Sequence, residues 1–397
     1  MHLSQKASAI SPSITLSIDA QAKKMQSEGV DVIGFGAGEP DFPTPPWIVQ
    51  AAKEAMDRGE TRYTPVAGTL ELRQAICDKL LKNNGLVYEP AHIVVSNGAK
   101  HSLFNCCMAV VDDGDEVIIP SPYWVTYPEL VKMAGGVPVF VRTMHEDGFL
   151  MTPQAFKAAI TKRTRALILN SPSNPCGSMY SRAQLEAIAQ IAVDNDIIVI
   201  SDEIYECLVY DGAEFVSIAS LGDEIKAHTI VVNGVSKAYA MTGWRIGYTA
   251  APKDVTDAMS GYQSHATSNP NSIAQAASVA ALKGPDTALE QMRAEFESRR
   301  NLMVEILNGI DGFNCNMPQG AFYTLPDISG CYGKKSGGVL IDGSMTFCSE
   351  LLEKALVAAV PGIAFGDDNT IRLSYATSRQ NIEKGLQRIK AFVQGLK

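Results

Sequence analysis

The sequence predicts an α/β protein in which a large domain with a mostly parallel β-sheet is joined to a smaller α/β domain. Seven short apolar segments alternate with helical patterns between about residues 93 and 252. These segments are apolar at nearly every position, which is typical of strands covered on both faces. The chain has 397 residues, more than one ordinary hydrophobic core accommodates, so a second domain is expected.

The predicted strands follow one another along the central part of the chain. They span residues 92–96, 115–120, 137–142, 165–172, 196–203, 229–234 and 244–251. Helical stretches lie between several of them, such as 181–195, where Ser181 is well placed to cap the helix N-terminus. Because strand and helix alternate, most strands are expected to run parallel to their neighbours.

After about residue 270 the pattern changes. Two helical segments are followed by a tail that mixes short strands with helices. The predicted helices span 271–284, 286–310, 344–356 and 379–396, and the predicted strands 320–326 and 369–378. We expect residues 1–45 to join the small domain, residues 46–300 to form the large domain and residues 301–397 to form the small C-terminal domain.

Composition and charge argue against several classes of protein. The net charge is −9 and the basic residues are scattered without runs, which argues against a nucleic-acid or anionic-membrane partner. The N-terminal stretch lacks the apolar core of a signal peptide, and no segment approaches membrane-spanning length. The eight cysteines include no C-x-x-C pair, so we expect free thiols in a reducing cytoplasm, without disulfides or a metal site.

Polar residues follow the first predicted strand, and ligands of open α/β sheets bind beyond the carboxyl ends of strands. Residues 92–96 lead into Gly98, Ala99 and Lys100, after which a helix is expected to start. A glycine at a helix N-terminus exposes backbone N–H groups at the positive end of the helix dipole, where phosphate binds well. The alternative is an ordinary helix cap, and this stretch taken alone favours the cap.

Two further strand ends carry acidic, phenolic and amide side chains. Asp202 lies at the end of segment 196–203, one residue before its last, and Tyr205 follows three residues after Asp202. A carboxylate here either caps a loop or holds a proton on a heterocyclic nitrogen, with the tyrosine hydroxyl near a neighbouring oxygen. Segment 165–172 leads into a turn that presents the amide of Asn174, for which a plain turn is the alternative.

A lysine and an arginine follow the next strand. Ser236 and Lys237 come directly after "TIVVNGV", and Arg245 follows a short stretch that contains Gly243, so the chain can bring the guanidinium back toward the lysine. An unpaired buried ammonium is costly. Pyridoxal phosphate accounts for all of these groups together, because it binds lysine as a Schiff base, needs an acidic partner for its ring nitrogen and carries a phosphate.

These residues also carry a resemblance. The motifs are "GAGEPDF", "RYTPVAGTLELR", "SPSNPCG", "SDEIYE", "NGVSKAYAMTGWRIGY" and "NTIRLSYATS". In this order, over nearly the whole chain, they resemble class-I aminotransferases of the aspartate aminotransferase family, in its bacterial subgroup with lysine in "GAK". The resemblance implies fold type I of the pyridoxal-phosphate-dependent transferases, with a mostly parallel seven-stranded sheet in the large domain and a smaller α/β domain.

The resemblance also implies site residues. The implied catalytic residues are Lys237, Asp202 and Tyr205. The implied cofactor contacts are Gly98, Ala99, Lys100, Trp124, Asn174, Asp202, Tyr205, Ser236, Lys237, Arg245 and, from a neighbouring subunit, Tyr63. The implied substrate contacts are Gly38, Lys100, Trp124, Asn174 and Arg372.

Each implied role has a physical rationale. Lys237 would hold the cofactor and then move the proton at the substrate Cα, while Asp202 would keep the ring nitrogen protonated. Tyr205 and Asn174 would hydrogen-bond the ring oxygen, and Trp124 would stack on the ring face.

The substrate contacts follow the same logic. Arg372 would bind the substrate α-carboxylate, near the backbone of Gly38, where a glycine permits close approach. Lys100 resembles the lysine that contacts the side-chain carboxylate of aspartate or glutamate in this subgroup. The alternative is that Lys100 is an ordinary solvated lysine at a helix start. Tyr63 would reach the cofactor phosphate of the neighbouring subunit in a homodimer, and residues 264–272 would also lie at the subunit boundary. The alternative is that Tyr63 packs within its own chain.

Three positions depart from the usual pattern of these relatives. Cys176 stands where threonine is usual, and His101 where glutamine is common. Gly234 stands where many relatives have a phosphate-binding serine, so Ser236 is the candidate replacement.

The predicted function is transfer of the amino group of L-aspartate to 2-oxoglutarate through a ping-pong cycle, and there are several alternatives. The same fold also serves aromatic, alanine and prephenate aminotransferases and β-lyases. An aminotransferase-like transcription regulator would need a basic winged-helix extension, for which the chain has no room before "GAGEPDF". A nicotinamide dehydrogenase is excluded because no G-x-G-x-x-G follows a strand.

Overall fold

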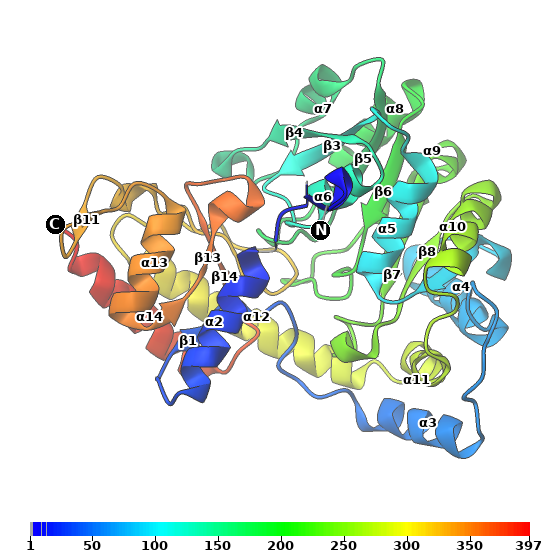
Figure 1. Ribbon diagram of the computed structural model, residues 1–397, viewed down its shortest axis with the longest axis horizontal. Coiled ribbons are helices and arrows are strands. Elements are labelled where there is room, and N and C mark those ends of the chain that lie inside the picture. The colour runs from blue at the N-terminus through cyan, green and yellow to red at the C-terminus, as the bar shows by residue number, and fades with distance from the viewer. Residues whose placement is uncertain (1–2, 9, 13) are drawn as a thin grey trace.

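All seven predicted strands form a single sheet, shown in the computed structural model of Figure 1. The structure describes residues 3–8, 10–12 and 14–397. Residues 1–2, 9 and 13 of the predicted N-terminal segment 1–45 lie outside the described residues. The strands are β2 (Ile93–Ser96), β3 (Glu116–Ser121), β4 (Val137–Arg142), β5 (Thr164–Asn170), β6 (Ile198–Asp202), β7 (Thr229–Gly234) and β8 (Gly247–Ala250).

The sheet is mostly parallel, as predicted. Its strand order is β2-β8-β7-β6-β5-β3-β4, and only β8 runs antiparallel to its neighbours β2 and β7. A parallel neighbour needs a long crossover, whereas an antiparallel neighbour can follow a short loop. The loop of residues 235–246 between β7 and β8 therefore stays at one edge of the sheet, and it carries Lys237 and Arg245.

Successive residues of a strand point to opposite faces of the sheet, and both faces are buried. On β7, Ile230 and Val232 belong to one apolar cluster, with helices α5 and α10, while Val231 belongs to another, with α4 and α11. This explains why the strands are apolar at every position. The helices of this part of the chain are α3 (Pro46–Asp57), α4 (Leu70–Asn84), α5 (Ala99–Val110), α6 (Tyr127–Met133), α7 (Pro153–Ala159), α8 (Arg182–Asp194), α9 (Asp223–Ala227), α10 (Lys253–Ala266) and α11 (Ser272–Lys283).

Two helix starts test the predictions made from sequence. Ser181 caps α8 as expected: its hydroxyl accepts the backbone N–H of Gln184, and the Gln184 side chain accepts the Ser181 N–H. The helix predicted to start after Lys100 begins earlier, at Ala99, because Gly98 takes the N-cap position with φ +87°. Lys100 therefore lies within the first helical turn.

A smaller body lies beside the sheet, on the left of Figure 1. It contains segments from both ends of the chain, since β1 (Ile33–Gly34) pairs in parallel with β12 (Val357–Ala358). Its other elements are α2 (Ile14–Ser27), α12 (Thr287–Asn308), β9 (Tyr323–Thr324), β10 (Lys335–Ser336), β11 (Val339–Leu340), α13 (Ser344–Ala355), β13 (Val360–Pro361), β14 (Ile371–Ser374) and α14 (Arg379–Gln394). The short helix α1 (Gln5–Ser8) lies instead beside α6 of the large sheet, where the N–H of Ser11 donates to Glu129 at 3.2 Å. The pairing of β1 with β12 shows why the N-terminal segment packs with the tail, while the exact boundaries after residues 45 and 300 stay predictions.

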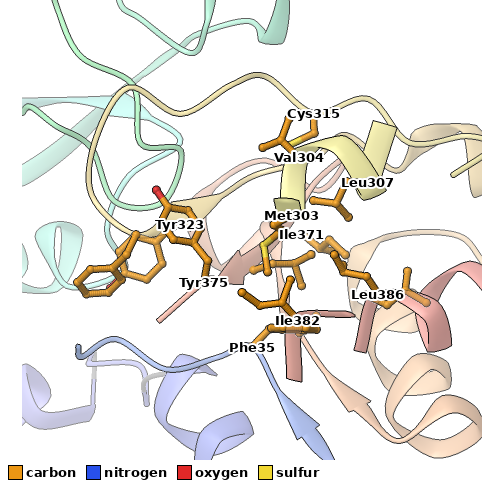
Figure 2. Close-up of a cluster of buried hydrophobic side chains, with 14 of the residues drawn as sticks. Phe35, Met303, Val304, Leu307, Cys315, Tyr323, Ile371, Tyr375, Ile382 and Leu386 are labelled. Carbon is orange, nitrogen blue, oxygen red and sulfur yellow. The ribbon is translucent and has the colours of Figure 1, made fainter. Parts of the chain in front are cut away.

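The core of the smaller body draws on distant parts of the chain (Figure 2). Phe35 of the N-terminal segment packs with Ile382 and Leu386, which lie one turn apart on α14, and with Met303 of α12. Strand β14 contributes Ile371 to the same core, with its neighbour Arg372 on the opposite side. Arg372 is thereby held rigidly at the edge of the core.

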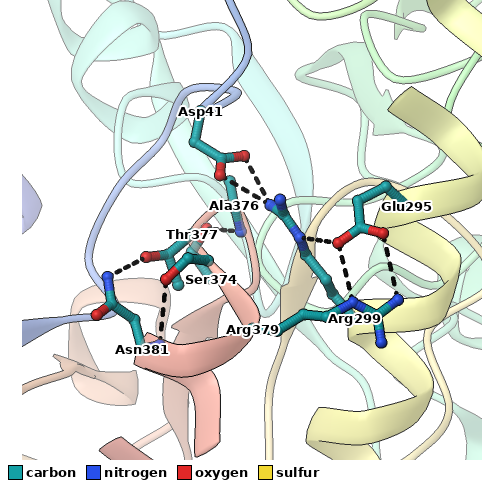
Figure 3. Close-up of polar contacts among 9 residues, drawn as sticks. Asp41, Glu295, Arg299, Ser374, Ala376, Thr377, Arg379 and Asn381 are labelled. Atoms are coloured by element: carbon teal, nitrogen blue, oxygen red, sulfur yellow. Dashed lines mark hydrogen bonds and ion pairs between the residues drawn. The ribbon is translucent and has the colours of Figure 1, made fainter. Parts of the chain in front are cut away.

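A polar network centred on the buried Arg299 fixes the segment that carries Gly38 (Figure 3). Arg299 of α12 donates two hydrogen bonds from Nη1 to Asp41, at 2.7 and 2.9 Å, and one from Nε to Glu295 at 2.9 Å. Arg379, the first residue of α14, donates to the same Glu295. The "GAGEPDF" segment is thus tied to two helices of the smaller body.

None of the helices in the described part of the chain is both long and apolar enough to cross a lipid bilayer.

Candidate active site

A cavity of about 440 Å³ lies where the carboxyl ends of β5, β6 and β7 face the smaller body. It is lined by Gly38, Ala99, Lys100, Trp124, Asn174, Asp202, Tyr205, Ser236, Lys237, Arg245 and Arg372, among others. The structure therefore brings together every site residue predicted from sequence except Gly98 and Tyr63. Gly98 lies directly behind the lining, next to Arg245, and Tyr63 is 92% exposed.

Lys237 points into this cavity. Its Nζ donates a hydrogen bond to the backbone oxygen of Gly38 at 2.5 Å. Burial, with the cations Arg245 and Arg372 nearby, lowers the pKa of Lys237 to about 8, although Glu39 and Asp202 oppose this shift. A substantial fraction of the amine is therefore neutral near pH 8, and only a neutral amine acts as a nucleophile or base.

Asp202 is buried at the end of β6, 3% exposed. Its carboxylate accepts a hydrogen bond from the hydroxyl of Tyr127 at 2.7 Å and one from the backbone N–H of Ile204 at 3.3 Å. Burial raises the pKa of Asp202 to about 6, so the carboxylate is still mostly ionised at pH 7. A fixed buried anion of this kind is a partner for a protonated nitrogen of a ligand.

Gly98, Ala99 and Arg245 form an anion cradle at the start of α5. The Arg245 guanidinium is held by the backbone oxygens of Thr242, at 2.9 Å, and Asn97, at 3.3 Å. A Cβ on Gly98 would lie 2.3 Å from Arg245 Nη2, so no other residue fits here without moving the guanidinium. The positive end of α5 and a fixed arginine together suit a phosphate group.

Arg372 also lines the cavity and is 3% exposed. Its Nη1 donates to Asn174 Oδ1 at 3.0 Å and its Nη2 to the backbone oxygen of Gly36 at 2.9 Å. Its Nε is buried and has no hydrogen-bond partner among the described residues. A buried donor left unpaired is costly, so this guanidinium is built to receive an anionic ligand such as a carboxylate.

Two aromatic contacts complete the walls. The hydroxyl of Tyr205 lies 3.1 Å from that of Tyr323, whose ring lies 4.5 Å below the Arg372 guanidinium. Lys100 Nζ lies 5.0 Å from the centre of the Trp124 ring. The Lys100 cation is therefore stabilised by an aromatic face within the same cavity.

Comparison with known proteins identifies the family. The sequence model described as "Aminotransferase class I and II" matches residues 30–389. The chain belongs to this aminotransferase family. It is 50% identical to an aspartate aminotransferase of Bacillus sp. (strain YM-2) and 48% identical to an aspartate/prephenate aminotransferase of Cereibacter sphaeroides, each over 99% of both chains. Its fold matches a crystal structure of aspartate aminotransferase from Rhizobium meliloti with a TM-score of 0.97 and 47% identity over all of both chains.

A second solved structure is similar over a comparable length. The aspartate aminotransferase of Thermus thermophilus with maleate gives a TM-score of 0.93 at 43% identity, covering 99% of this chain and 100% of that one. Both structures confirm the predicted α/β fold, and the family membership confirms the predicted type of enzyme, a transaminase dependent on pyridoxal phosphate.

Several residues of this aminotransferase cavity were missed from sequence. Tyr127, Tyr323 and Glu39 all line it. Tyr127 is the first residue of α6, and its ring packs edge to face on that of Trp124 at 5.4 Å, a contact made by the turn before the helix and not by a helical spacing. Tyr323 comes from β9, more than a hundred residues after Tyr205, and no local pattern pairs them.

Gly234, where a serine was expected, has a packing reason in this aminotransferase. A Cβ at this position would lie 2.9 Å from the backbone oxygen of Ile246 and 3.0 Å from the Cα of Gly247. Strands β7 and β8 therefore approach too closely for a serine. Ser236 lines the cavity, but its role in binding phosphate stays a prediction.

Proposed function

We propose that the protein is an aspartate aminotransferase, which transfers the amino group of L-aspartate to 2-oxoglutarate in a ping-pong cycle of pyridoxal and pyridoxamine phosphate. The observation that carries the proposal is that Lys237 lines one cavity together with Lys100 and with Arg372, whose buried Nε has no hydrogen-bond partner among the described residues. Two cations suit a substrate with two carboxylates. The relatives named aspartate aminotransferase, and the maleate in the Thermus thermophilus structure, support a dicarboxylate substrate.

The residues present fit pyridoxal phosphate. The cradle of Gly98, Ala99 and Arg245 suits its phosphate, and the carboxylate of Asp202 suits its ring nitrogen. When bound, the cofactor supplies an electron-withdrawing ring that acidifies the substrate Cα–H. Asp202 would keep a proton on the ring nitrogen, and the hydrogen bond from Tyr127 orients the Asp202 carboxylate for this role.

The protein's own groups then position the substrate and move the proton. Arg372 binds the α-carboxylate through its unpaired Nε and fixes the orientation of Cα relative to Lys237. Lys237, with a pKa of about 8, would take the proton from the substrate Cα as a neutral amine and would then deliver that proton to the cofactor. Tyr205 and Asn174 would hold the cofactor by donating hydrogen bonds to its ring oxygen.

The proposal is tested by initial rates with 2-oxoglutarate and a panel of amino donors. Aspartate is expected to give the highest kcat/KM, ahead of phenylalanine, tyrosine and alanine. A second candidate function, prephenate transamination, is favoured by the relatives named aspartate/prephenate aminotransferase at 46–48% identity. Prephenate with aspartate or glutamate as donor therefore belongs to the same assay. An aromatic amino acid or alanine as the best donor would overturn the proposal.

Lys100 is expected to decide selectivity for dicarboxylic substrates. Replacing Lys100 with methionine removes the cation but keeps an apolar side chain over Trp124. Loss of one charge-assisted contact, roughly 1.5–3 kcal/mol, should raise KM for aspartate about ten- to a hundredfold and leave KM for alanine almost unchanged. Equal losses for the two donors would show that Lys100 is only a solvated helix residue.

The Gly98 cradle is expected to tolerate no side chain. Gly98→Ala should weaken cofactor binding by about tenfold or more, because the new Cβ would displace Arg245, a charge-assisted anchor of the phosphate. Gly114→Ala is a matched control, since Gly114 has a similar φ of +90° but open space around its Cβ. Equal cofactor dissociation constants for the two variants, measured by fluorescence titration, would contradict the role of the cradle.

We also propose that the enzyme is a homodimer in which Tyr63 reaches the cofactor phosphate of the partner subunit. The exposure of Tyr63, 92%, is unusual for a large aromatic side chain and supports an intermolecular contact. A cytoplasmic location is supported by the eight free cysteines.

Refolding of mixed variants tests the shared site. Lys237→Ala and Tyr63→Ala chains are each expected to be nearly inactive, and refolding them together should restore about a quarter of wild-type activity. Half of the dimers are then hybrids with one intact site, assuming random pairing in a twofold dimer. No recovery on mixing would place Tyr63 in its own subunit's site.

A further inference from the structure

A buried polar cluster lies on the side of the active-site turn that faces away from the cavity. It consists of Lys79 and Asn84 of α4, Glu206 of the turn after β6 and Asn233 of β7, and we call it the Lys79–Glu206 cluster. Lys79 and Glu206 are each 8% exposed. None of the four residues lines the candidate active site.

The cluster is fully connected by hydrogen bonds. Lys79 Nζ contacts Glu206 Oε1 directly and donates to Asn84 Oδ1 at 2.9 Å. The other oxygen, Glu206 Oε2, accepts from Asn84 Nδ2 at 2.7 Å, and Asn233 Nδ2 donates to Oε1 at 2.6 Å. The Glu206 carboxylate is therefore held by three side chains from two different elements.

These contacts attach the cluster to two parts of the active site. Glu206 directly follows Tyr205, and its N–H donates to the backbone oxygen of Glu203, next to Asp202. Asn233 precedes Lys237 by four residues, and its side-chain oxygen accepts the backbone N–H of Gly234 at 2.7 Å. One carboxylate thus links the turn that carries Tyr205, which follows β6 and Asp202, to the end of β7, three residues before Lys237.

Stability alone is a weak reason for such a pair. Taking two charges out of water costs about as much as their attraction returns, and apolar residues of similar size often serve a core as well or better. The ionisable neighbours of the pair are Glu203, Cys207, Tyr239 and Tyr248, none of which supplies a second cation for Glu206. The pair does supply a directional, rigid connection between α4, the turn and β7.

We propose that Lys79 and Glu206 are positioning residues for the transamination: the buried pair holds Tyr205 and the Lys237 strand end in register with each other. This inference rests on the proposed function, in which Tyr205 donates to the cofactor ring oxygen and Lys237 moves the Cα proton. Neither Lys79 nor Glu206 touches substrate or cofactor. Their loss is expected to affect the chemical step more than substrate binding.

The test compares the holoenzyme with four variants: Lys79→Met, Lys79→Arg, the double variant Lys79→Met with Glu206→Met, and the control Lys82→Met. Lys82 lies on the same helix, and its side chain is 75% exposed. In Lys79→Met, kcat for aspartate should fall about ten- to a hundredfold with KM within twofold of wild type. The pH midpoint of the cofactor's visible absorption should rise by roughly half a unit or more, because a misplaced Tyr205 stabilises the deprotonated form less.

The double variant separates positioning from stability. Removing both charges should restore much of the thermal stability lost in Lys79→Met, yet kcat and the absorption midpoint should stay altered. Lys79→Arg, which keeps a cation, should recover part of kcat, and Lys82→Met should match wild type. The proposal would be overturned if the folded double variant had the kcat and the absorption midpoint of the wild type. It would also be overturned if Lys79→Met lost stability and kcat in parallel and the double variant recovered both.

A measurement on the cofactor-free protein keeps this test separate from the proposed function. Hydrogen exchange of peptides covering residues 203–208 and 233–237 should be about tenfold faster in the double variant than in Lys82→Met. Absence of transamination in the wild type would refute the proposed function, while the exchange rates would still decide whether the cluster orders the turn. Unchanged exchange in both peptides would refute the positioning role.

Discussion

Replacing Lys237 with alanine is expected to lower kcat for transamination by about 10⁴-fold or more. The variant lacks the amine that we propose to hold the cofactor and to move the Cα proton, and that bonds the backbone oxygen of Gly38. Lys237→Arg should be as inactive as Lys237→Ala, because arginine keeps the charge but stays protonated and cannot act as a base. Initial rates with aspartate and 2-oxoglutarate measure this loss.

Lys283→Ala is the control for this prediction. The Lys283 side chain is 53% exposed and forms a surface ion pair with Glu71, so its replacement should leave kcat unchanged. Activity of Lys237→Ala within tenfold of wild type would rule out Lys237 as the reactive amine.

Replacing Arg372 with lysine is expected to lower kcat/KM by about 10²–10³ for every amino donor. Arginine presents a planar fork, whereas lysine offers a single charged group that cannot bind Asn174, Gly36 and a carboxylate together. Loss of a bidentate, charge-assisted contact is about 3–4 kcal/mol, which gives this factor.

The substrate dependence of the Arg372→Lys defect distinguishes it from that of Lys100→Met. Because all amino donors share the α-carboxylate, aspartate and alanine should lose kcat/KM by similar factors. Arg163→Lys serves as the control, since the Arg163 side chain is 70% exposed and bonds Glu116 away from the cavity. If Arg372→Lys lowered kcat/KM for aspartate alone, Arg372 would bind the side-chain carboxylate of the substrate and not its α-carboxylate.

Much of the fold could be predicted because each strand of the large sheet is buried on both faces. Val231 and Val232 point to opposite faces yet lie in apolar clusters on both sides, so the strand reads as an unbroken apolar run. The ends of these strands meet at one edge, and this is why Asp202, Asn174 and Lys237 could be assigned to one site before any geometry was known.

The remaining features depend on contacts that sequence spacing does not encode. Tyr323 meets Tyr205 only because β9 packs beside the turn after β6, and Gly234 is required only because β8 approaches β7 closely. The early start of α5 at Ala99 reflects the positive φ of Gly98, a property of the cap and not of the helical pattern. Tyr63 was assigned by resemblance, and its role across a dimer stays a prediction.

Borohydride reduction followed by peptide mass mapping tests the central claim most directly. The purified enzyme, loaded with pyridoxal phosphate, is treated with borohydride and digested. We expect the cofactor mass on the peptide that contains Lys237, and its loss from that peptide when aspartate is added before the reductant. Permanent labelling of a different lysine, or labelling of Lys237 that aspartate does not change, would contradict the assignment of this cavity as the transaminating site.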